Sequence, residues 1–390
     1  MSTARSVLAV AMLLFAFPFA AAPSAAGAEP RATTRVIIGY VFPRERVIEA
    51  AEIDAAKLTH VNYAFANIVE GRVVEGFVKD AENLRVLTGL RATYPAFKVL
   101  VSVGGWTWSG GFSEAAATPE SRARFVASAV DFVRRHDLDG FDVDWEYPGL
   151  PGFGNPYGPR DKANFTLLMA ELRVALDADA KPRGRSALLT MAAGAFKQFL
   201  EQTEMDKVAA SVDFVNLMTY DFRVEDDPVA GHHANLFPHP ADEKKGSADG
   251  AVRDFLAAGV PADKLVLGVP FYGRAWRSEG GDASARGLYQ PAARPAERIE
   301  TGYAKLAAER VDRAGFGRQW DPVAQAPYLW SPEARVFVSY EDPESLRAKC
   351  RYVRDKGLAG VMFWEYFADQ PGGALLSTLF DELRAPLTRK

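Results

Sequence analysis

The sequence predicts an α/β protein in which eight parallel strands, most of them followed by a helix, close into a (β/α)8 TIM barrel. Short runs rich in β-branched and aromatic residues recur eight times, and amphipathic stretches separate most of them. The runs lie at Arg35–Phe42, Leu58–Asn67, Phe97–Gly105, Gly140–Tyr147, Ala187–Ala195, Val212–Tyr220, Leu265–Tyr272 and Gly360–Tyr366. An open doubly wound sheet is the alternative. It is disfavoured because no glycine-rich phosphate loop follows the first run.

The stretches between the strands have the periodicity of surface helices. Pro119–His136 is the clearest, and Asn164–Leu176 and Pro343–Lys356 follow the same rule. In the first of them one helical face carries the apolar residues Phe125, Val126, Ala129, Phe132 and Val133. The single cysteine, Cys350, falls on the apolar side of the last helix, so we expect a buried thiol.

One interval breaks the alternation of strand and helix. About 85 residues separate the seventh and eighth strands, and only Pro343–Lys356 is needed as a crossover helix. A structureless loop of that length is improbable, so residues 274–338 are expected to form a small α+β insertion subdomain. Its strand signals lie around Gly287–Tyr289 and Arg335–Tyr340. The barrel would then comprise residues 29–273 and 339–390.

The N-terminal segment and the composition limit where the protein works and what it binds. Residues 1–28 resemble a signal peptide, because Arg5 precedes an apolar run that ends in Ala26-Gly27-Ala28. A membrane anchor is the alternative, but prolines interrupt the run. We therefore expect a secreted, extracellular protein with no membrane association after cleavage. The net charge of −4 without basic clusters argues against nucleic-acid binding, and a monomer is expected.

The most informative segment is residues 139–146, which read Asp-Gly-Phe-Asp-Val-Asp-Trp-Glu. On a strand, Asp142, Asp144 and Glu146 would face one side, and the apolar residues between them would pack under helices. Carboxylates about 7 Å apart repel each other when all are ionised. Such a row is typical of a site in which one group holds a proton near neutral pH and passes it on.

The order of the acids along the strand suggests their roles. Pro148 stops the strand, so Glu146 is expected at the barrel mouth as an exposed proton donor. Asp144 would tune Glu146, and Asp142 would share a proton with Asp144. The alternative is a set of buried carboxylates paired with basic residues, but the run itself contains no Lys or Arg. Asp139 lies outside the alternation and is expected to be structural.

The run resembles the signature of family 18 glycoside hydrolases, Asp-x-x-Asp-x-Asp-x-Glu. Four further segments resemble motifs of that family in order, each at the predicted C-terminal end of a strand. They are Ser102-Val103-Gly104-Gly105-Trp106, Met218-Thr219-Tyr220-Asp221, Phe271-Tyr272-Gly273-Arg274-Ala275-Trp276 and Met362-Phe363-Trp364-Glu365. The third resembles the segment that opens the chitinase insertion subdomain of the family.

The resemblance implies a substrate-assisted mechanism, which is the family's exception to two-carboxylate catalysis. Glu146 would protonate the glycosidic oxygen, and the N-acetyl carbonyl oxygen of the substrate would attack the anomeric carbon to give an oxazolinium ion. Asp144 would orient the acetamido group and Tyr220 would hydrogen-bond its oxygen. Water activated by Glu146 would open the ring with retention. Tyr40 and Ser102 would hold Asp142.

The resemblance also implies a sugar-binding surface. Trp364 would form its floor and Trp106 would stack on the leaving-group side, while Asp221, Tyr272 and Arg274 would hydrogen-bond the sugar, with Met218 beside them. Core packing is the alternative reading for each aromatic, and it is favoured for four residues of the insertion: Trp276, Tyr303, Trp320 and Trp330.

The function implied is a secreted chitinase that hydrolyses β-1,4-linked N-acetylglucosamine polymers and binds chitin and chito-oligosaccharides. The alternatives are a hydrolase of peptidoglycan or of the N-glycan core, and a non-catalytic chitin-binding lectin. No cofactor or metal is expected. The histidines of the 231–239 segment are expected to pack in a loop or line the groove wall rather than bind metal: His232, His233 and His239.

Overall fold

The computed structural model describes residues 35–384. The predicted signal peptide, residues 1–28, lies outside this range. Within the range, no helix combines the length and the apolar character that crossing a membrane requires.

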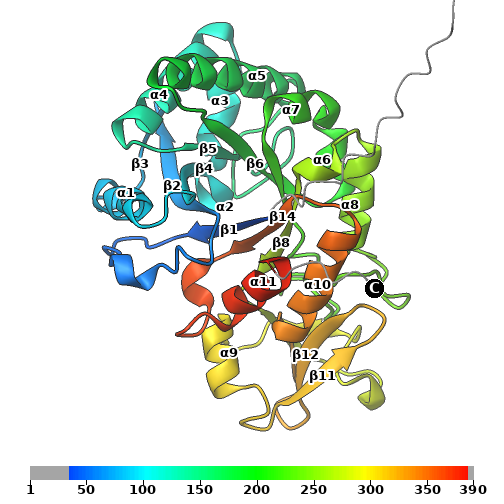
Figure 1. The fold of residues 1–390 in the computed structure, drawn as a ribbon. Coiled ribbons are helices and arrows are strands. Elements are labelled where there is room, and N and C mark those ends of the chain that lie inside the picture. The colour runs from blue at the N-terminus through cyan, green and yellow to red at the C-terminus, as the bar shows by residue number, and fades with distance from the viewer. Residues whose placement is uncertain (1–34, 385–390) are drawn as a thin grey trace, which may run out of the picture. The chain divides into compact units, whose positions relative to one another are not determined.

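Eight parallel strands form a closed barrel, as the sequence predicts (Figure 1). They are β1 (Val36–Val41), β2 (His60–Val69), β4 (Lys98–Gly104), β5 (Gly140–Asp144), β6 (Leu188–Gly194), β7 (Phe214–Met218), β8 (Leu265–Pro270) and β14 (Gly360–Trp364). The barrel is closed because β1 pairs with β2 on one side and with β14 on the other. All eight predicted strands are present, although most are a few residues shorter than expected.

Helices surround the barrel. The three predicted helices are found as α4 (Pro119–Arg135), α5 (Asp161–Ala180) and α10 (Pro343–Asp355). The others are α1 (Asp80–Gly89), α2 (Gly105–Trp108), α3 (Phe112–Ala116), α6 (Lys197–Glu201), α7 (Met205–Ser211), α8 (Ala248–Ala257) and α11 (Ala374–Arg384). Cys350 is buried in α10, as expected, and burial raises the pKa of its thiol to about 12.

The first connection departs from the strand–helix rule. Between β1 and β2 there is only a short 3-10 turn, Ala50–Glu52. This segment buries Ile48, Ile53 and Leu58, and their five-residue spacing does not match the 3.6-residue period of an α-helix. After β2, an unexpected strand, β3 (Arg72–Glu75), pairs with it in antiparallel register.

Strand β5 separates two environments, as its alternating sequence indicates. Its outward row continues into Trp145, directly after the strand, and packs beneath helices: Trp145 stacks on Phe112 of α3 with centroids 5.2 Å apart and meets Phe165 of α5 edge-on at 5.8 Å. Its inward row, Asp142 and Asp144, is buried in the barrel interior. The outer core therefore fixes the strand that carries the acids.

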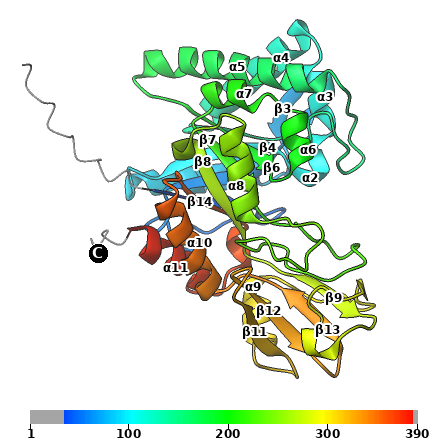
Figure 2. The same cartoon turned by 90° about the vertical axis from the view of Figure 1, so that its right-hand side faces the viewer.

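A second sheet lies between β8 and β14 (Figure 2). It is antiparallel, in the order β10-β9-β13-β12-β11, and comprises β9 (Arg274–Ser278), β10 (Ala292–Ala293), β11 (Gly317–Asp321), β12 (Ala326–Ser331) and β13 (Val336–Ser339), with α9 (Tyr303–Glu309). The strand expected at Arg335–Tyr340 is present as β13. The strand expected around Gly287–Tyr289 is wrong, because Gly287 and Tyr289 have φ of 78° and 54°, which no strand adopts.

Candidate active site

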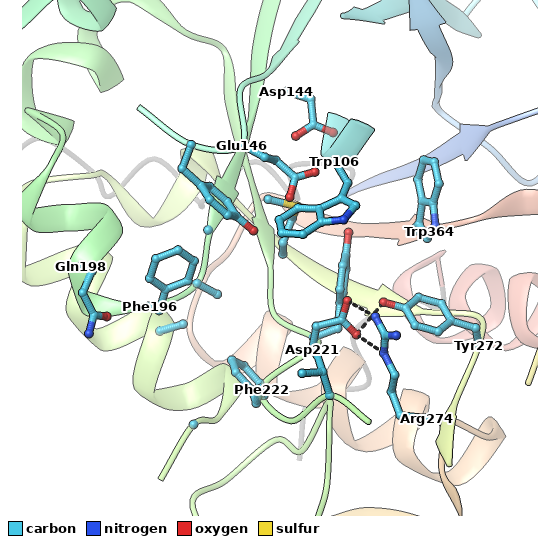
Figure 3. A pocket seen from close by; sticks show the side chains of 18 of the residues that line it. Trp106, Asp144, Glu146, Phe196, Gln198, Asp221, Phe222, Tyr272, Arg274 and Trp364 are labelled. Carbon is cyan, nitrogen blue, oxygen red and sulfur yellow. Dashed lines mark hydrogen bonds and ion pairs between the residues drawn. The ribbon is translucent and has the colours of Figure 1, made fainter. Parts of the chain in front are cut away.

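A groove of about 1230 Å³ lies at the C-terminal ends of the barrel strands (Figure 3). Most of the predicted site residues line it: Trp106, Asp144, Glu146, Met218, Tyr220, Asp221, Tyr272, Arg274 and Trp364. Three others, Tyr40, Ser102 and Asp142, are buried in the barrel interior. Of the four aromatic residues considered in the insertion, none lines the groove, and Trp276 and Tyr303 are buried.

Asp142 lies at the centre of a buried hydrogen-bond network. It accepts hydrogen bonds from the hydroxyls of Tyr40 (2.9 Å), Ser102 (2.7 Å) and Thr190, and from the amide of Asn216 (3.3 Å). Burial raises the pKa of Asp142, and these four donors counteract the rise. None of these hydrogen bonds involves Asp144. The expectation that Asp142 and Asp144 share a proton therefore stays a prediction.

The carboxyl group of Asp144 has fewer hydrogen-bond partners than that of Asp142. One of its carboxyl oxygens is buried and has no hydrogen-bond partner among the described residues. Burial raises the pKa of Asp144 well above its usual value, and the charges of Glu146 and Asp142 raise it further. The structure therefore favours a protonated Asp144 with a free hydrogen-bonding position near the groove.

Glu146 lines the groove but is only 8% exposed, so the expectation of an exposed donor is wrong. Burial raises the pKa of its carboxyl to about 7; a hydrogen bond with the neighbouring Tyr147 acts to lower it, and the charge of Asp221 raises it. A carboxylic acid with this pKa holds its proton at mildly acidic pH and can release it near neutrality, as a general acid must.

Two side chains that the sequence analysis missed hold the backbone of Glu146. The Ser109 hydroxyl accepts the Glu146 N–H at 2.9 Å and lies 3.0 Å from the Asp144 carbonyl oxygen. The Asn155 amide donates to the Glu146 carbonyl oxygen at 2.9 Å. Both are buried and come from the loops that follow β4 and β5. The one sequence signal for these two residues is their position. Ser109 lies close to Gly105-Trp106, and Asn155 lies close to Pro148.

Asp221 joins the predicted polar residues of the groove into one cluster. It accepts hydrogen bonds from the Tyr272 hydroxyl (2.8 Å) and from Arg274 Nε (2.9 Å) and Nη2 (2.7 Å), and the His233 Nδ1 lies 3.4 Å away. Burial acts to raise the pKa of Asp221, but the hydrogen bonds from His233 and Arg274 and the Arg274 charge bring it below its usual value. Arg274 also binds Glu225 at 2.9 Å. An ionised Asp221 therefore orients two groove side chains.

The histidines near the groove have carboxylate neighbours that the sequence did not reveal. His232 Nε2 lies 3.1 Å from Asp321 of the second sheet, and His239 lies 3.9 Å from the same carboxyl. Burial lowers the pKa of both His232 and His233, so both are neutral near pH 7. Within residues 35–384, no group of three or more His, Cys, Asp or Glu side chains is placed to hold a metal ion.

Aromatic rings line part of the groove, among them Trp364 and Trp106. Trp364 stacks on Phe65 with centroids 5.4 Å apart and contacts Phe42 at 5.6 Å. Trp106, in the first turn of α2, is 49% exposed and lies 6.5 Å from the Tyr147 ring. Gly104, two residues before Trp106, has a φ of 104°, and a Cβ there would lie 2.3 Å from the Asp144 carbonyl oxygen, so only glycine fits at this turn.

Asp139 has a different environment from the other three acids. It pairs with Arg91 (3.1 Å), Arg185 (3.2 Å) and Lys98 (3.5 Å), all from outside the acidic run, and accepts the Val99 N–H at 3.0 Å. This is the structural position that its spacing indicates. Asp142, Asp144 and Glu146 make no salt bridge with a described basic residue.

A parallel barrel with a row of buried acids beside a groove lined by aromatic rings has the architecture of a glycoside hydrolase. The family model for glycosyl hydrolases family 18 matches residues 36–369. The chain therefore belongs to family 18, whose signature the acidic run resembles.

Two named relatives are similar to most of this chain. Chitinase A1 of Niallia circulans is 36% identical over 99% of this chain and 63% of its own length, so the chain spans less than two thirds of that relative. Chitotriosidase-1 of Mus musculus is 33% identical, covering 88% of this chain and 74% of its own.

Solved structures agree on the fold. A family 18 N-acetylglucosaminidase from Paenibacillus barengoltzii is 42% identical with a TM-score of 0.81, covering 89% of this chain and 99% of its own. The chitinase ChiA74 from Bacillus thuringiensis is 35% identical with a TM-score of 0.84, covering 92% and 71%.

Proposed function

We propose that the protein is a secreted chitinase that cleaves β-1,4-linked N-acetylglucosamine chains with retention, through an oxazolinium intermediate. The observation that carries the proposal is the pair Asp144 and Glu146, both buried at the groove. Glu146 has a pKa raised to about 7, and Asp144 has a carboxyl oxygen without a partner among the described residues. Such a pair supplies a proton donor and a polar group that can accept from a substrate N–H.

The mechanism assigns one task to each group. Protonated Glu146 gives its proton to the glycosidic oxygen as the C–O bond breaks. The carbonyl oxygen of the substrate's own acetamido group forms a new bond to the anomeric carbon. Asp144 passes its proton to the neighbouring Asp142 and accepts a hydrogen bond from the acetamido N–H, and its negative charge then stabilises the resulting cation. Glu146, now ionised, takes a proton from water as the water opens the ring, and the proton on Asp142 returns to Asp144, which restores the starting state.

The surrounding residues support this sequence of steps. Asp142 offers Asp144 a neighbouring carboxyl group whose own oxygens are held by Tyr40, Ser102 and Thr190. The Tyr220 side chain lines the groove, and its pKa is raised well above the usual value, chiefly by burial and then by the Asp144 charge. A neutral Tyr220 hydroxyl can donate to the acetamido oxygen. Trp364 supplies an apolar face for the sugar ring.

The names of several relatives also favour chitin as the substrate. A second candidate is an N-acetylglucosaminidase that removes single sugars, because the Paenibacillus barengoltzii enzyme is 42% identical to this chain. A chitin-binding lectin is disfavoured because Glu146 is present. Export by cleavage after residue 28, and the division into a catalytic barrel and an insertion of residues 274–338, belong to the same proposal.

Digestion of chitin and of reducing-end-labelled hexasaccharide by the purified protein separates these candidates. Soluble oligosaccharides of two or more sugars are expected in the early products. Early release of monosaccharide alone would establish the N-acetylglucosaminidase instead, and binding to chitin without any product would leave only the lectin.

Replacing the proton donor tests the chemical assignment. Glu146→Gln keeps the shape and the backbone hydrogen bonds of residue 146 but cannot transfer a proton, so kcat should fall by about 10²–10⁴. Affinity for a chito-oligosaccharide, measured by calorimetry, should change little. A variant with more than a tenth of the parent turnover would contradict the role of Glu146.

A further inference from the structure

A second hollow lies on the antiparallel sheet, beside the groove. Its volume is about 400 Å³, and its charged lining residues are three arginines and one acid: Arg277, Arg294, Arg335 and Glu279. Arg294 also lines the groove, so the two cavities adjoin each other. A volume of this size is sufficient for a small molecule, since such sites occupy about 300–1,000 Å³. A ligand that enters the hollow would meet mainly positive charge.

The register of the sheet brings the three arginines together. Arg277 of β9 pairs with Ala293 of β10 on one side and with Val336 of β13 on the other (Figure 2). Arg294 directly follows Ala293, and Arg335 directly precedes Val336. Neighbouring strands lie about 4.8 Å apart, so the three guanidinium groups extend from adjacent positions of one sheet. Because the arginines are far apart along the chain, no basic run in the sequence indicates the cluster.

The positive charge of the cluster is only partly compensated. Of the three arginines, Arg294 alone forms a salt bridge with a described residue, to Asp226 at 2.8 Å. Glu279, the one acid of the lining, forms none within residues 35–384. Like charges on adjacent strands repel each other, so the cluster costs free energy while the hollow holds no anion. An anion that contacts Arg277 and Arg335 together would remove this repulsion.

The backbone beneath the arginines is held firmly. Trp276, next to Arg277, is fully buried, and its indole N–H donates to the Val224 carbonyl oxygen at 3.1 Å. The Ser278 N–H donates to the Arg335 carbonyl oxygen at 2.8 Å, which joins β9 to the start of β13. The arginine backbone is therefore ordered before any ligand arrives, and this lowers the entropic cost of binding.

We propose that this hollow is a separate binding site for an acidic sugar, one that carries a sulfate, phosphate or carboxylate group. Arg277 and Arg335 would bind the oxyanion through paired N–H donors, the geometry that guanidinium groups supply best. Glu279 can accept hydrogen bonds from the sugar hydroxyls. The hollow has room for the sugar ring as well as the anion, and it adjoins the groove of a glycoside hydrolase at Arg294. The site does not depend on the hydrolytic chemistry of Glu146.

The test is calorimetric titration of the parent protein with three probes: N-acetylglucosamine 6-sulfate, N-acetylglucosamine and inorganic sulfate. The sulfated sugar should bind at least about tenfold more tightly than the neutral sugar, because only it meets the guanidinium groups. It should also bind more tightly than inorganic sulfate, which lacks the ring. Its affinity should fall as sodium chloride is raised from 20 to 300 mM, since salt screens exposed charges.

Three kinds of variant assign the binding to the hollow. Arg277→Gln and Arg335→Gln should each weaken binding of the sulfated sugar about tenfold. Neither residue lines the groove, so hydrolysis of a neutral chito-oligosaccharide should stay at the parent rate. Glu279→Gln removes a like charge and should tighten binding of the sulfated sugar. Arg298→Gln is the matched control: it makes the same change of charge at an exposed side chain outside the hollow, and it should change nothing.

Three results would overturn the proposal. Equal affinity of the parent for the sulfated and the neutral sugar would show that the arginines do not select the anion. Inorganic sulfate bound as tightly as the sulfated sugar would show a site for an ion alone. A loss in Arg298→Gln as large as that in Arg277→Gln would show general attraction by surface charge. Because binding is measured directly, failure of the protein to cleave chitin would refute the proposed function and leave this test unaffected.

Discussion

At the scale of single residues, four acids of one octapeptide have four different environments. Asp139 is paired with arginines, Asp142 is held by hydroxyls, Asp144 keeps a free oxygen, and Glu146 is buried with a pKa of about 7. Sequence places them two or three residues apart. Their surroundings, supplied by other strands and loops, determine which acid keeps its proton and which remains charged.

The raised pKa of Glu146 makes both activity and stability depend on pH. The rate should fall as pH rises through about 7, because the ionised carboxylate cannot protonate the glycosidic oxygen. Stability should fall in the same direction. The folded state holds the proton between the ordinary pKa of 4.5 and about 7 while the unfolded state releases it, so folding is penalised progressively across that window.

Above pH 7 the penalty is on the order of 3 kcal/mol, because each tenfold change in the acid dissociation constant corresponds to about 1.4 kcal/mol. Glu146→Gln, which carries no charge, should therefore raise the free energy of unfolding at pH 8 and change it little at pH 4. Urea titrations at the two pH values measure the difference. Equal effects at both would show that the carboxyl is not desolvated in the folded protein.

Asp144→Asn tests the free carboxyl oxygen. Asn can still turn an amide oxygen towards the substrate N–H, but it cannot supply the negative charge that stabilises the cation, so kcat should drop about 10²–10³-fold. Thermal unfolding should shift upward or stay constant, since a buried acid beside two others is removed. Near-normal turnover near pH 6 would exclude Asp144 from the reaction.

At the scale of elements, the acids depend on loops that meet over the end of β5. Ser109 follows β4 and Asn155 follows β5, and each binds the backbone of residues 144–146. The strand itself ends at Asp144, so Glu146 has no neighbouring strand to hold it. The two side chains therefore replace the missing ladder hydrogen bonds.

Ser109→Ala should reduce kcat more than it changes KM, because the Glu146 N–H loses its acceptor and the carboxyl is less well positioned. We expect a three- to thirtyfold loss of kcat and about 1–2 kcal/mol of stability. Thr118→Ala is the matched control: it removes the N-cap of α4, which costs about 1 kcal/mol without reaching the groove. If both variants keep the parent kcat, Ser109 contributes to stability alone.

At the scale of the whole molecule, a buried ion pair joins three parts of the chain. Lys349 of α10 binds Glu341, which follows β13, and also donates to the Ala234 carbonyl oxygen, next to His233, whose Nδ1 lies 3.4 Å from Asp221. Both charged side chains are fully buried. The pair therefore connects the end of the second sheet, a barrel helix and the segment that supports Asp221.

Lys349→Met leaves Glu341 and the Ala234 carbonyl without their partner, and should cost about 3–5 kcal/mol of unfolding free energy. The double variant Lys349→Met, Glu341→Leu should recover a large part of that loss, since no unpaired charge remains. Lys305→Met, which breaks an exposed pair with Glu309, should stay within about 0.5 kcal/mol of the parent. A Lys349→Met variant as stable as that control would show that the pair contributes nothing.

The sequence alone predicts the structure correctly where the signal is local. The alternation of Phe141, Val143 and Trp145 with the acids predicts both faces of β5, and the apolar periodicity of Pro119–His136 predicts α4. It was insufficient where partners are distant: Thr190 and Asn216 bind Asp142 from other strands, and the loops that bury Glu146 have no local pattern. The turn at Gly287–Tyr289 was missed because its strand-like composition does not reveal a positive φ.

The alternation along β5 has a consequence for how this strand can vary. Its outer row requires only apolar volume that matches the helices, and several residue types satisfy that need. Its inner row requires particular acids. Insertion or deletion of a single residue would exchange the two rows, directing the carboxyls into the apolar shell and the aromatic rings into the reaction centre. The length of this strand therefore tolerates change less well than the identity of its outward residues, and folding and chemistry would be lost in the same event.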